Sequence, residues 1–119
     1  MRAQMTALGV ALVAFLATSH PVRAVTIADL RANLDAYDHR VVTVIGTVEV
    51  ALPVNGESGY ELRDGPAKVD VLSRGSPPAV GDRLSVTGTV KVFHEGDPGE
   101  AESRTFPPFI LESSRAPAP

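Results

Sequence analysis

Four side chains with binding chemistry lie close together in the sequence, namely Tyr60, Arg63, Lys68 and Arg74. An aromatic ring can stack on a base or a sugar and basic groups neutralise phosphates, so the combination is typical of surfaces that bind single-stranded nucleic acid. We therefore predict that these four residues contact a ligand. A plainer interpretation stays open, in which Tyr60 caps a hydrophobic core and the basic residues are independent solvated charges.

The strand pattern around these residues argues against tight binding of a polyanion. If alternate residues face a core, the outward set holds three acids, Glu49, Glu61 and Asp70, against two bases, Arg63 and Lys68. This set contains no aromatic ring, although single-strand binders usually combine a positive groove with stacked aromatics. Cross-strand ion pairs on a solvated face explain the same pattern.

The residue types that could bind a metal or catalyse a reaction are few. His39, His94, Glu95 and Asp97 are candidate ligands, but no second histidine stands near His94 at the spacing that a three- or four-ligand zinc site needs. The chain has no Cys and lacks a G-x-S-x-G elbow, a P-loop and an H-E-x-x-H motif. We predict no catalytic residue, no metal and no cofactor, hence a protein that is not an enzyme; a site in the His94 loop is the weakest alternative.

An apolar segment near the end of the chain, Phe106–Leu111 (FPPFIL), has two interpretations. It can be an edge on which a partner docks, because it is the most apolar segment that looks exposed. Alternatively, Phe109 and Leu111 complete the core while Phe106 covers one end of it.

Residues 1–24 have the three-part layout of a secretory signal peptide. Arg2 is followed by an uncharged apolar run over residues 5–17, too short to span a bilayer as a helix. We expect cleavage after Ala24, a periplasmic or secreted protein and no stable membrane insertion; a retained anchor is the alternative. Cleavage would leave 9 basic and 14 acidic side chains, and a net negative charge gives no long-range attraction to polyanions.

The remaining sequence predicts one short helix followed by strands. Residues 25–36 carry an apolar stripe at helical spacing, preceded by Thr26 as a cap. Residues 39–52 then alternate, which places Val42, Val44, Val48 and Val50 on one face, with Gly46 as the expected bulge or bend. Asn55-Gly56 predicts a turn.

Three further strands complete the pattern. A hairpin is expected from 60–64 and 68–72 around Gly65-Pro66. Residues 82–93 repeat the design of the first strand, with Gly88 at the bend, and 109–113 form a last short strand. Closing such a sheet into a barrel removes its edges, and mid-strand glycines supply curvature. We predict an all-β domain over 37–115, a five-stranded barrel, followed by a disordered tail over 116–119.

Four motifs carry a family resemblance. V-x-V-x-G-x-V (Val42–Val48), Y-x-L-x-D-G (Tyr60–Gly65), V-x-V (Val69–Val71) and G-D-R-L-x-V-x-G-x-V (Gly81–Val90) resemble the bacterial exported OB-fold proteins, relatives of the tRNA-anticodon-binding type of OB domain. The resemblance covers roughly residues 40–113 and implies an OB-fold barrel.

The same resemblance implies a non-enzymatic binding module. Its ligand would be an oligonucleotide, a glycan or an envelope protein on the outer face of the first three strands. Nucleic-acid or oligomer binding is thus implied by the family. The alternative is an envelope protein–protein interaction or stress-tolerance module that binds no nucleic acid.

Overall fold

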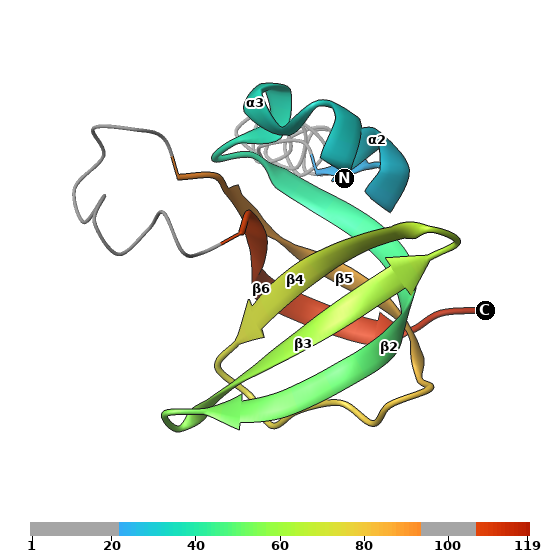
Figure 1. Cartoon of the computed structure of the whole chain (residues 1–119), viewed down its shortest axis with the longest axis vertical. Helices are drawn as coiled ribbons and strands as arrows, with labels where there is room; N and C mark the ends of the chain where they lie inside the picture. The colour runs from blue at the N-terminus through green and yellow to red at the C-terminus, as the bar shows by residue number, and fades with distance from the viewer. Residues whose placement is uncertain (1–21, 94–106) are drawn as a thin grey trace, which may run out of the picture.

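The computed structural model describes residues 22–93 and 107–119 (Figure 1). Two short helices and six strands make up this part of the chain. They are β1 (Arg23–Ala24), α2 (Ile27–Ala32), α3 (Leu34–Tyr37), β2 (Val41–Val54), β3 (Glu57–Asp64), β4 (Ala67–Ser73), β5 (Arg83–Lys91) and β6 (Phe109–Pro117).

The five longer strands form a closed barrel. The strand order is β1-β2-β3-β4-β6-β5, and a further pairing of β2 with β5 joins the two ends of the sheet. β4 and β6 run parallel, while β2–β3, β3–β4, β5–β6 and β2–β5 are antiparallel. Inward-facing aliphatic side chains from all five strands fill the interior, among them Val44, Leu62, Val71, Val86 and Ile110. The predicted all-β, five-stranded barrel with a short N-terminal helical segment is confirmed.

The N-terminal segment covers one end of the barrel as two helical turns rather than one helix (Figure 1). Thr26 caps α2, since its Oγ1 accepts a hydrogen bond of 3.0 Å from the Asp29 backbone N–H. Ile27 and Leu30 are fully buried against the barrel. The continuous helix predicted over 25–36 is wrong because Asn33 leaves the helical region (φ −135°, ψ 42°) and separates α2 from α3.

Both predicted tight turns are present. Asn55 and Gly56 have φ of 48° and 82°, the left-handed pair that a two-residue hairpin loop between β2 and β3 needs. Gly65, with φ of 61°, starts the equivalent turn between β3 and β4.

The two mid-strand glycines have different roles. The register between β5 and β6 shifts beside Gly88, where Ser113 is the extra residue, so the predicted irregularity lies on the partner strand. At Gly46 there is no bulge; a Cβ there would lie 3.0 Å from the Arg63 carbonyl oxygen, so the glycine allows close packing instead.

The bulge in β2 lies at Glu49. Val48 pairs with Leu62 and Val50 pairs with the next residue, Glu61, so that Glu49 is the extra residue. A one-residue insertion moves every later side chain to the opposite face of the sheet. The alternation predicts that Val50 faces inward with Val48, but its side chain is 47% exposed, and Leu52 and Val54 are exposed with it.

The ends of the chain also differ from expectation. The disordered tail predicted over 116–119 is wrong. Ala116 and Pro117 belong to β6 and pair with Ser85 and Leu84 of β5, and Arg83 hydrogen-bonds the last two residues, accepting from the Ala118 N–H at 2.9 Å and donating to the Pro119 oxygen at 3.0 Å. Most of the predicted signal peptide lies outside the described residues, but Arg23 and Ala24 form β1, parallel to β2. Within residues 22–93 and 107–119, no helix has the length and apolar character to cross a bilayer.

Candidate binding groove

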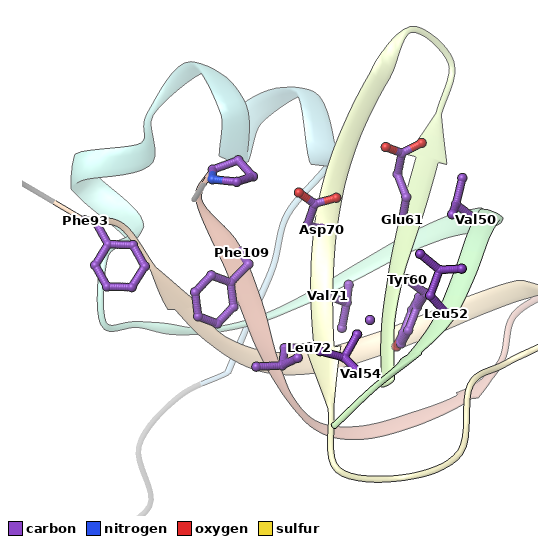
Figure 2. A pocket seen from close by; sticks show the side chains of 12 residues that line it. Val50, Leu52, Val54, Tyr60, Glu61, Asp70, Val71, Leu72, Phe93 and Phe109 are labelled. Carbon is purple, nitrogen blue, oxygen red and sulfur yellow. The ribbon is translucent and has the colours of Figure 1, made fainter. Parts of the chain in front are cut away.

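A hollow of about 520 Å³ lies on the outer face of the barrel, over β3 and β4 (Figure 2). Figure 2 shows Val50 and Leu52 of β2 on one side of it, Phe93 and Phe109 on the other, and β3 and β4 between them. Val54, Gly59, Tyr60, Glu61, Asp70, Val71, Leu72 and Pro107 complete its lining. We call this hollow the groove.

The strand register explains why the groove is mainly apolar. One row of neighbours across four strands reads Val50, Glu61, Asp70 and Phe109. The next row begins Leu52, Gly59 and Leu72. Because Gly59 has no side chain, the second row leaves a gap between two leucines, and the groove is hollowed there.

The bulge at Glu49 creates the β2 side of the groove. Without it, Val50, Leu52 and Val54 would face the barrel interior, as the simple alternation predicts. Leu52 is 58% exposed and Val50 nearly half exposed, a contiguous apolar edge of the kind that marks binding surfaces.

Two carboxylates occupy the middle of the first row. Glu61 and Asp70 stand directly opposite each other on β3 and β4, and both line the groove. Lys68 Nζ lies 3.7 Å from Glu61 Oε1. Asp70 has no ion-pair partner among the described residues.

The four predicted ligand-binding residues are not gathered at one site. Tyr60 lines the groove but is only 3% exposed. Arg63 Nε lies 2.8 Å from Glu49 Oε1, and Lys68 contacts Glu61, so both bases form cross-strand ion pairs of the kind expected on a solvated face. Arg74 is exposed after β4 and lines a separate hollow of about 360 Å³ with Ser73 and Thr89.

Tyr60 belongs to a polar cluster on the Glu112 carboxylate. Its hydroxyl donates a hydrogen bond to Glu112 Oε1, and the Ser73 hydroxyl donates to Oε2 at 2.7 Å. Arg115 lies 3.4 Å from the same carboxylate, and its guanidinium is 5.7 Å from the centroid of the Tyr60 ring. Burial, followed by the hydrogen bond to Glu112, raises the pKa of Tyr60 above its usual range. This cluster ties β6 to β3 and β4, and the ring is covered rather than free to stack.

Sequence reasoning missed most of the groove. The alternation along β2 predicts that Val50 faces inward, and it assigns no role to Leu52 or Val54. The core interpretation of the apolar segment around Phe109 is wrong about its faces: Ile110 is fully buried, while Phe109 and Leu111 are only partly covered. Phe106 and the His94 loop lie outside the described residues. Among the described residues, no three His, Asp or Glu side chains come together as a metal site.

The closed five-stranded barrel, with its parallel β4–β6 pair, short helical segment at one end and groove on the outer face, defines an OB-fold domain. No protein-family model matches the chain, and no curated protein matches it in sequence.

Solved structures share the fold. An aspartyl-tRNA synthetase from Entamoeba histolytica matches over 86% of this chain with a TM-score of 0.59 and 18% identity. An asparaginyl-tRNA synthetase from the same organism matches over 85%, with a TM-score of 0.59 and 15% identity. This chain covers only 24% and 25% of those two proteins. The telomere capping protein Ten1 from Saccharomyces pombe matches over 82% of both chains, with a TM-score of 0.52 and 18% identity.

Proposed function

We propose that this domain is an exported, non-enzymatic binding module whose groove takes an extended segment of a partner protein. The observation that carries the proposal is the lining of the groove, which is apolar at both ends and acidic in the middle. Such a surface favours apolar side chains through burial. It disfavours a phosphate backbone, because phosphates would approach Glu61 and Asp70.

The dimensions of the groove suit a short extended segment. The row from Val50 to Phe109 crosses three inter-strand spacings, which corresponds to about 14 Å. An extended chain covers that distance with about four residues. Side chains at the two ends of such a segment would contact Leu52 on one side and Phe93 on the other.

Nucleic-acid binding is the second candidate function. Phe93 and Phe109, with ring centroids 6.0 Å apart, are aromatic groups on which bases could stack. Of the basic groups that such a site also needs, Arg63 pairs with Glu49 and Lys68 with Glu61, which leaves Lys91, the β5 neighbour of Phe109, as the base nearest to the two rings in the strand register. The likeness to tRNA synthetases and Ten1 supports the fold alone.

Fluorescence anisotropy of the purified protein separates these candidates. The probes are a fluorescein-labelled neutral octapeptide, Gly-Ser-Leu-Phe-Gln-Val-Ser-Gly, and a labelled 15-nucleotide oligothymidylate at low and moderate salt. We expect the peptide to bind and the oligonucleotide not to bind. Leu52→Gln should weaken peptide binding, whereas Val80→Gln, at an exposed apolar residue outside the groove, should not. Salt-dependent oligonucleotide binding that Phe93→Ala abolishes would instead establish the second candidate.

Export is part of the proposal and has its own test. The apolar run after Arg2 supports it, together with the small residues before Val25. The intact mass of the protein recovered from a periplasmic fraction should correspond to a chain that begins at Val25. A full-length mass in the cytoplasmic fraction would contradict export.

A further inference from the structure

We propose that Glu61 and Asp70 recognise a lysine or arginine side chain of the segment that docks in the groove. The inference rests on the proposed function and adds the chemical identity of the central ligand residue: a cation between two apolar side chains. It starts from the register, which puts the two carboxylates directly opposite each other in the β3–β4 ladder.

This arrangement is unfavourable in the free protein. Like charges at directly opposite positions of a sheet destabilise it, and Glu61 and Asp70 are both partly buried. Lys68 relieves the repulsion only in part, since it contacts Glu61 from the side toward the hairpin turn, and within residues 22–93 and 107–119 Asp70 has no ion-pair partner. A second cation placed between the two carboxylates would interact with both.

The neighbours of the two acids fit a long basic side chain. Across β2, β3, β4 and β6 the row reads apolar, acidic, acidic, apolar, from Val50 to Phe109, and Lys91 of β5 follows Phe109. The methylene stem of lysine or arginine can cover apolar surface while its charged end reaches a carboxylate. Phe109, directly opposite Asp70, adds an aromatic face that attracts a cation.

The overall charge of the chain favours the same ligand. The sequence has 11 basic and 14 acidic side chains, so its field attracts cationic segments and repels anionic ones. A segment with the pattern apolar, basic, apolar therefore matches the groove in both shape and charge. A purely apolar ligand would leave the two carboxylates facing each other under a cover that excludes water, which is costly.

A matched set of peptides tests the inference. The central Gln of the neutral octapeptide is replaced by Lys in one probe and by Glu in another, and dissociation constants are measured by anisotropy. We expect the Lys peptide to bind about five-fold more tightly than the Gln peptide, which is the upper end of the range for partly exposed ion pairs. The Glu peptide should bind more weakly than the Gln peptide, and added salt should reduce these differences.

Two double variants identify the residues responsible. In Glu61→Gln/Asp70→Asn the three peptides should bind equally well. Asp64→Asn/Asp82→Asn removes the same number of charges from exposed residues outside the groove and should keep the preference for Lys. The first variant should also unfold at an equal or higher urea concentration than the unmodified protein, because it removes a like-charge contact and loses only the 3.7 Å ion pair of Glu61 with the exposed Lys68, which contributes little.

The possible failures are distinguishable. If the Lys and Gln peptides bind equally to the unmodified protein, the inference is wrong while the proposed function stands. If the preference for Lys survives in Glu61→Gln/Asp70→Asn, the assignment to these two residues is wrong. If no peptide binds, the proposed function fails, and the inference fails with it.

Discussion

Replacing Gly88 by alanine should destabilise the barrel strongly, although the change adds only one methyl group. A Cβ at this position would lie 2.3 Å from the Leu111 carbonyl oxygen and 2.6 Å from Ile110 Cγ2. These contacts are about 1 Å closer than van der Waals distance, so β5 and β6 must separate beside the bulge. Overpacking costs about 1–3 kcal/mol and a lost backbone hydrogen bond about 1 kcal/mol, against a gain of about 0.4–1 kcal/mol from a less flexible unfolded chain.

We therefore expect Gly88→Ala to lower the free energy of unfolding by roughly 1–3.5 kcal/mol, taking these terms together. The measurement is urea unfolding followed by circular dichroism, in which such a loss moves the midpoint by about 1–3 M.

Two other glycines serve as controls for this series. Gly46→Ala meets its nearest atoms at 3.0–3.2 Å and should cost clearly less than Gly88→Ala. Gly75→Ala meets only the Ser73 hydroxyl, at 3.6 Å, and should change stability by less than about 0.5 kcal/mol. If Gly88→Ala is as stable as Gly75→Ala, then β5 and β6 do not approach each other closely at Gly88 in the folded protein.

Three further predictions concern the polar cluster and the N-terminal segment. Because burial raises the pKa of Tyr60, the folded protein keeps this proton at a pH where the unfolded chain loses it. The stabilisation from the protonated Tyr60 should therefore be complete below about pH 10, and the free energy of unfolding should fall above that pH by at most about 1.4 kcal/mol per pH unit. Urea midpoints measured across the alkaline range should show this fall in the unmodified protein and lack it in Tyr60→Phe. The same pH dependence in both proteins would contradict the prediction. Thr26→Ala removes the cap that accepts from the Asp29 N–H and should cost about 1 kcal/mol in urea unfolding, while Thr26→Ser should restore most of the loss. Removing residues 1–24 deletes β1, whose two residues are exposed, but keeps the 3.0 Å hydrogen bond from the Val25 N–H to the Thr43 oxygen. Because little buried structure is lost, the thermal unfolding midpoint should drop by less than about 8 °C. An unfolded product would show that β1 is essential.

Much of the barrel could be predicted from residues that act locally. Asn55-Gly56 and Gly65 specify turns because they accept left-handed backbone angles, whatever the rest of the chain does. Thr26 marks the start of a helix in the same local way, through a side-chain bond to a residue three positions later. The alternation from Val42 to Val48 identifies the inner face of β2 as long as the strand stays regular.

The groove could not be predicted because it depends on an irregularity set by long-range pairing. Val48 exchanges backbone hydrogen bonds of 2.8 Å with Gly81 and Asp82 on one side of β2, and it pairs with Leu62 of β3 on the other. Beyond this point β2 has only β3 as a partner among the described strands, and the register shifts at Glu49. No residue type between Val48 and Val54 predicts this bulge from the sequence.

The sequence by itself therefore determined the barrel, its turns and its inner face, because these follow from backbone preferences and from alternation along each strand. Only the tertiary structure decided which side chains form the binding surface. It turned Val50 and Leu52 outward, buried Tyr60 against Glu112 from 52 residues away, and set Glu61 opposite Asp70. Each of these contacts depends on which strands pair and in what register, and that is a property of the closed sheet rather than of any one segment.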